Sequence, residues 1–235
     1  MRKYVLTDAD GVTALGTKLQ PGKLVQDTRQ KVDLISKLVG CGSDTPLLAT
    51  LISSLPAEQA RLFQINCWTV SVDPRQPSSY TVVKEVKPVP SVQLEHKLAF
   101  GLQVFLSLGT DRDFRSWAQS WLDETDRSPE TAHALLKTEE KEKEAASELE
   151  ALTAWGESGT NDSIGHDMDE LAERCDHLVR AAILFPDPSK TDDVAQLISL
   201  ALTSLAGVAG KVNLPAMAEQ TLASAQQSTR GAAGG

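Results

Sequence analysis

The chain has 235 residues, of which 41% are hydrophobic, enough for one large domain or two small ones with a sizeable core. It carries 32 acidic and 23 basic residues, a formal net charge of -9, which excludes attraction of its whole surface to nucleic acid or anionic lipid. The longest apolar stretch falls short of a membrane span, and the 3 widely spaced cysteines do not fit a zinc site. We therefore expect no membrane insertion and a place in the cytoplasm or within an assembled particle.

The first 63 residues predict a strand followed by helices. Residues 4–20 are typical of a hairpin, or of a strand and a loop, closed by the turn signal Gln20-Pro21-Gly22. The spacing of apolar residues then predicts helices over about 25–38 and 46–55, and a short one over 57–63.

The pattern changes to alternation over 64–72 and again over 80–86, with a polar loop between the two segments. Alternating apolar and β-branched residues around such a loop predict an antiparallel strand pair. The segment Lys87-Pro88-Val89-Pro90 follows as an extended linker and is the best candidate for a domain boundary.

Beyond this linker the sequence is helical in character. Helices are expected over 91–108, over 111–123, from 129 into the Glu/Lys-rich stretch 137–150, from 162 or 163 to 185, over 191–208, and from 215 onward. The Gly/Ala-rich end has too little apolar surface to order itself alone, so it is free or docks on a partner.

These elements predict an α+β protein that is predominantly helical. We divide it into an N-terminal mixed part, residues 1–90, with two short β-hairpins, and a multi-helix domain, residues 91–226. A flexible tail, residues 227–235, completes the chain.

One segment, Tyr4-Val5-Leu6-Thr7-Asp8-Ala9-Asp10-Gly11, has the composition of a catalytic motif. It can be a strand that delivers two carboxylates to its carboxyl edge, one as a nucleophile and one as a general acid that helps to hold a cation. It can equally be the first half of a hairpin that turns at Asp10-Gly11, with residues 12–15 as the return strand. We favour the hairpin, in which neither carboxylate is catalytic.

Residues 4–12 resemble the first motif of the haloacid-dehalogenase-like phosphatases, an apolar strand followed by Asp-x-Asp-Gly. The resemblance implies that Asp8 forms a phospho-aspartate and that Asp10 protonates the leaving group. It also implies a magnesium ion that offsets the repulsion between the carboxylates and the phosphate.

Later residues fit the same family loosely. Ser107 ends an apolar run, as does the residue that binds the transferring phosphoryl group, and Asp187 with Asp192 or Asp193 is similar to the acidic motif that holds magnesium. Pro186 stands where the family has glycine, and the chain lacks the strand-helix alternation of a doubly wound sheet.

Our leading hypothesis is a non-enzymatic structural protein that self-associates, a coat or nucleocapsid-type subunit. It rests on the scarcity of catalytic groups and on helices whose apolar faces are broad enough for neighbours. In this interpretation the partner is a second copy of the chain, nucleic acid is bound only through a local basic groove, and no cofactor is needed. The alternative is the magnesium-dependent phosphatase that uses Asp8 and Asp10.

Overall fold

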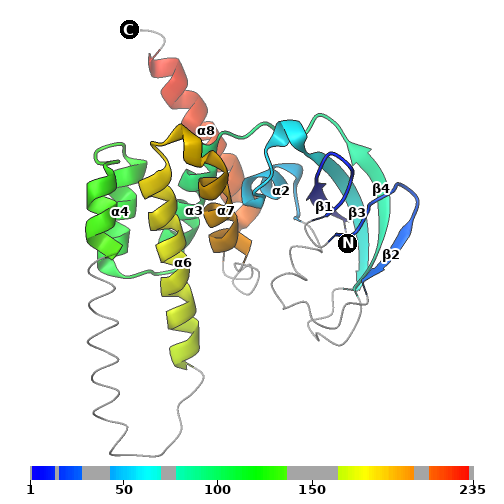
Figure 1. Cartoon of the computed structure of the whole chain (residues 1–235), viewed down its shortest axis with the longest axis horizontal. Coiled ribbons are helices and arrows are strands. Elements are labelled where there is room, and N and C mark those ends of the chain that lie inside the picture. Colours follow the sequence, from blue (N-terminus) through cyan, green and yellow to red (C-terminus); the bar gives the residue numbers. More distant parts are fainter. Residues whose placement is uncertain are drawn as a thin grey trace, which may run out of the picture.

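The computed structural model describes residues 2–13, 16–27, 43–69, 78–136, 164–203 and 212–232. Within these residues a small antiparallel sheet is followed by a larger helical part, which confirms the predicted α+β class with helix dominant. Figure 1 shows the sheet at one end of the molecule and most helices at the other, with the short helix α2 (Pro46–Ile52) between them.

The sheet contains four strands in the spatial order β1-β3-β4-β2, and every neighbouring pair is antiparallel. The strands are β1 (Arg2–Thr7), β2 (Leu24–Asp27), β3 (Arg61–Thr69) and β4 (Ser78–Val86). The predicted pair of strands is confirmed as β3 and β4, with Ile65 opposite Val82. β3 begins earlier than expected, because Leu62 and Phe63 lie on opposite faces and both are fully buried.

The two faces of the sheet pack against different parts of the chain. On one face, Phe63 and Val82 form a cluster with Leu19 from the loop after β1. On the other face, Leu6 of β1 packs with Ala49 of α2. Both faces near β1 and β3 are therefore buried, and α2 is fixed against the sheet.

The return strand of the predicted first hairpin requires correction. β1 pairs with β3, and every residue of β1 has a partner on that strand. Val12 does not pair with β1 and forms an isolated bridge with Lys18. The turn itself is present, since Gly11 donates its N–H to the C=O of Asp8 at 3.1 Å. β3 offers six paired residues with apolar side chains on both faces, which the short return strand does not.

Two expected helices are wrong where the structure describes them. Residues 25–27 belong to β2, and the rest of the helix predicted over 25–38 lies outside the described residues. The helix expected over 57–63 is a single 3-10 turn, η1 (Ala57–Gln59), followed by β3. In both segments pairing with the sheet overrides the local helical spacing.

The helices beyond residue 91 are confirmed at or near their predicted starts. They are α3 (Leu94–Ser107), α4 (Arg112–Leu122), a helix over 129–136, α6 (Ile164–Leu184), α7 (Thr191–Thr203) and α8 (Leu214–Ala232). Residues 227–232, predicted as flexible tail, form the last turns of α8, which extends beyond the other helices (Figure 1). The division into units 1–90 and 91–226 stays a prediction.

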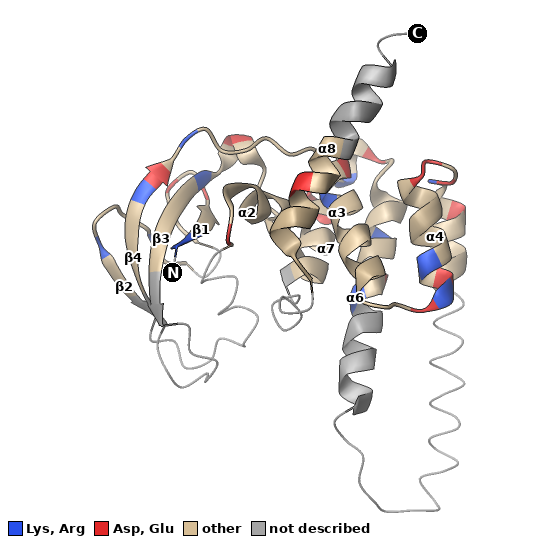
Figure 2. Cartoon of the chain, turned by 180° about the vertical axis from the view of Figure 1, so that it is seen from behind, with Lys and Arg blue, Asp and Glu red and all other residues tan. Residues whose placement is uncertain are grey.

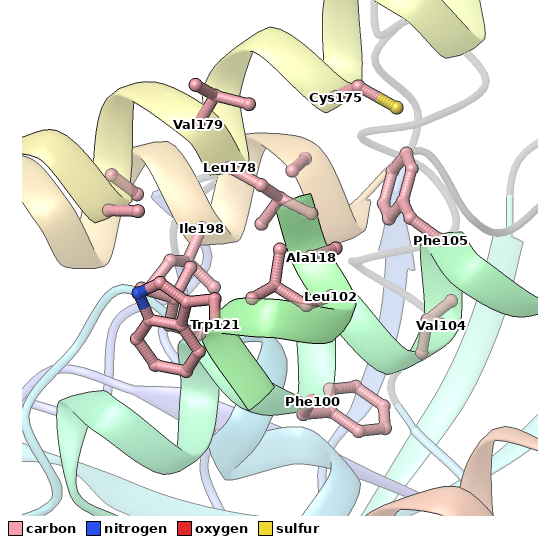
Figure 3. Packing of buried hydrophobic residues seen from close by; sticks show 14 of the residues in the cluster. Phe100, Leu102, Val104, Phe105, Ala118, Trp121, Cys175, Leu178, Val179 and Ile198 are labelled. Atoms are coloured by element: carbon pink, nitrogen blue, oxygen red, sulfur yellow. The ribbon is translucent and has the colours of Figure 1, made fainter. Parts of the chain in front are cut away.

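One apolar cluster holds the helical part together. Phe100 and Leu102 of α3, Trp121 of α4, Leu178 of α6 and Ile198 of α7 are almost completely buried in it (Figure 3). Such a core is close-packed, so a change of even one methylene group is felt by its neighbours.

α3 and α6 cross at close range where α3 carries Gly101. A Cβ atom at this position would lie 2.8 Å from Cδ2 of Leu178, a distance that real Cβ atoms essentially never show. The absence of a side chain at Gly101 therefore permits the contact between these two helices.

Among the described helices, none has both the length and the apolar content needed to cross a membrane. Basic and acidic residues are interspersed along the described ribbon (Figure 2).

Candidate functional site

A pocket of about 230 Å³ lies beside the outer edge of β1, between the loop that follows this strand, the C-terminal end of α2, and α7. Its lining combines apolar side chains with the hydroxyl groups of serines and threonines. Asp8 is the one charged residue among the lining residues, which include no Lys, Arg or His in the part of the chain that the structure describes. The pocket is smaller than the roughly 300–1,000 Å³ that holds drug-sized ligands, so it fits a small group.

Among the described residues, the edge of β1 beside this pocket is paired at Tyr4. The N–H of Tyr4 donates to the C=O of Ser43 at 2.8 Å, and its C=O accepts from the N–H of Ser43 at 2.7 Å. The bridge is isolated within the described residues, and residues 28–42, which precede Ser43, lie outside them.

The backbone of Leu6 is the next to point toward this edge. Alternate residues of an antiparallel strand direct their N–H and C=O to the same side, so Leu6, like Tyr4, directs both groups away from β3. Among the described residues neither group has a hydrogen-bond partner on that side. Beyond it, the N–H of Asp8 donates to the C=O of Val12 at 3.0 Å and closes the edge again.

The carboxylate of Asp8 shapes the loop that follows β1. Its Oδ1 accepts hydrogen bonds from the N–H of Asp10 at 2.9 Å and of Val12 at 2.8 Å, as in an Asx turn. Its Oδ2 accepts no hydrogen bond from the described residues. The Asp-Ala-Asp-Gly pattern therefore has a structural use at this position, and one carboxylate oxygen of Asp8 is left over.

Asp10 is exposed and lies within electrostatic reach of Arg61 of β3, where its charge contributes to a raised pKa of the guanidinium. The main partner of Arg61 is Glu85 of β4, which accepts from Nη2 at 2.8 Å and from Nε at 3.2 Å. These hydrogen bonds from Arg61, assisted by Lys87, lower the pKa of Glu85 to about 2. The guanidinium nearest to Asp10 is thus already engaged by a carboxylate.

A buried cation lies behind the wall of the pocket. Lys97 of α3 is 5% exposed, and its Nζ donates to the C=O of Ser53 at 2.6 Å and of Leu55 at 3.4 Å. Burial lowers the pKa of Lys97 to about 8, opposed by the charge of Glu58. Because both carbonyls follow the last turn of α2, the ammonium group closes the C-terminal end of that helix.

The sequence analysis missed Lys97. The available signal was a lysine in the first turns of a helix expected to be buried.

The other residues selected by the phosphatase resemblance are used locally and do not line the pocket beside Asp8. Ser107 donates its hydroxyl to a backbone C=O of its own helix at 2.6 Å. Asp187 accepts from the hydroxyl and the N–H of Ser189, which lowers the pKa of Asp187, and Asp192 is exposed in the first turn of α7. Within the described ranges, no three His, Cys, Asp or Glu side chains gather as a metal site would require.

No known protein family matches the chain, and no curated protein or solved structure matches it. Any functional proposal therefore rests on the geometry of the molecule.

Proposed function

We propose that the protein is a non-enzymatic structural subunit that self-associates, of the coat or nucleocapsid type. The observation that carries this proposal is the outer edge of β2, which ends the sheet among the described strands. Leu24 opens this strand and is 60% exposed although it is apolar. An edge strand with an exposed apolar side chain is a template for pairing with a second chain.

Two copies satisfy this edge by pairing β2 with β2 around a two-fold axis. Such an interface uses the same surface on both subunits and joins the two four-stranded sheets edge to edge. It would cover Leu24, which pairs within its own sheet with Thr81 of β4. The neighbouring Val83 of β4 is also exposed and extends the apolar surface.

The chemistry of the pocket favours this proposal over the magnesium-dependent phosphatase. A phosphoryl group needs cationic partners near the attacking carboxylate. The described lining of the pocket contains Asp8 without a basic side chain, and Arg61 near Asp10 is bound by Glu85. β1 is moreover an edge strand of an antiparallel sheet and not a strand of a doubly wound one.

A nucleic-acid partner and a place within an assembled particle belong to the same proposal. Because Lys and Arg are interspersed with Asp and Glu along the described ribbon (Figure 2), such a contact requires a basic surface that is local.

Light scattering coupled to size-exclusion chromatography tests the proposal. We expect the wild-type chain to form oligomers at micromolar concentration and Leu24→Lys to dissociate them, since lysine on an edge strand opposes pairing. Leu200→Lys is the matched control, because Leu200 is also an exposed leucine, at 47%, but lies on α7.

A wild-type monomer at the highest attainable concentration contradicts self-association. Oligomers that resist Leu24→Lys but dissociate on Leu200→Lys contradict the assignment of the contact to β2.

A further inference from the structure

We draw no further inference here: the strongest candidate, the pocket beside β1 that Asp8 lines, carries nothing because residues 28–42, which precede Ser43 of its lining, lie outside the described residues, and nothing in the structure shows what covers it.

Discussion

Asp8 uses its two carboxylate oxygens differently. Oδ1 organises the turn after β1 through the N–H groups of Asp10 and Val12, and Oδ2 accepts no hydrogen bond within the described residues. The hydrogen bonds of Oδ1 and the negative charge of this residue are therefore separable by substitution, because Asn keeps the first oxygen and removes the charge.

We expect Asp8→Asn to leave the free energy of unfolding within about 0.5 kcal/mol of wild type, whereas Asp8→Ala should lose about 1–2 kcal/mol. The reason is that alanine leaves both backbone N–H groups without their acceptor. Urea unfolding at neutral pH measures the difference, and equal stability of the two variants would show that the turn does not depend on this side chain.

Asp8→Asn also tests the alternative that the protein is a magnesium-dependent phosphatase. Wild type should release no phosphate from a generic phosphomonoester above background in the presence of magnesium. Turnover that Asp8→Asn abolishes, and that Asp10→Asn slows by about 10²–10⁴ as for a lost general acid, would replace the structural proposal with the phosphatase.

Lys97 makes stability depend on pH in an unusual direction. Its pKa is about 8 in the folded chain, whereas an exposed lysine has a pKa of 10.5, so between these values the unfolded chain binds the extra proton. Unfolding therefore becomes less favourable as pH rises through this window, by up to about 3 kcal/mol for this group.

Lys97→Met should remove this gain. The stability of wild type relative to the variant is expected to increase from pH 8 to 10.5, measured by urea unfolding at several pH values. Lys23→Met, which replaces an exposed lysine, is the matched control. A difference between wild type and Lys97→Met that stays constant over the window would mean that the ammonium group is not desolvated.

At the scale of elements, the helices were predictable and one strand was not. α4 shows why: Phe114, Trp117 and Trp121 recur at helical spacing, all are buried, and Asp111 caps the first turn. The spacing of apolar residues predicts such helices because each of them buries one face. The residues of β2 lie at the start of a segment with helical spacing of apolar residues. They form a strand because they pair with β4, some 50 residues later, and local spacing does not predict that pairing.

The candidate site was predictable only in part. The sequence singled out Asp8, and the structure places it at a pocket. The remaining features depend on contacts between distant segments, such as the bridge of Tyr4 to Ser43 and the hydrogen bond from Lys97 to Ser53. Ser107 and Asp187 matched the family pattern by type and order, but type and order do not bring side chains together.

The crossing of α3 and α6 yields a prediction at this scale. Gly101→Val should destabilise the fold by about 1–3 kcal/mol, because its side chain would overlap that of the fully buried Leu178. Leu178→Ala alone should also destabilise, by about 2–5 kcal/mol. The double variant should lose less than the sum, which a double-mutant cycle in urea measures, and strict additivity would show that the two positions do not touch.

At the scale of the molecule, α8 is anchored near its start. Ala218 and Thr221 are buried, and the hydroxyl of Thr221 donates to Oε1 of Gln103 in α3 at 2.6 Å. The last turns of the helix extend beyond the other helices (Figure 1).

Deleting residues 227–235 should therefore cost well under about 1 kcal/mol of folding stability and act, if at all, on assembly. Thermal unfolding of the dissociated subunit and light scattering measure the two effects separately. A fall of the melting temperature by more than a few degrees would place this segment in the core.

The position of α2 has a consequence for synthesis. Its Leu48 and Leu51 are buried in the helical cluster. The C=O of Ile52 accepts a hydrogen bond from the hydroxyl of Ser199 in α7, which lies 147 residues later in the sequence. A ribosome that adds about 5–20 residues per second completes α7 roughly 7 to 30 s after α2 has been made. For that interval the side of α2 that faces α7 lacks its final partner although all four strands of the sheet have been made, so the nascent chain presents an apolar surface that a chaperone can bind.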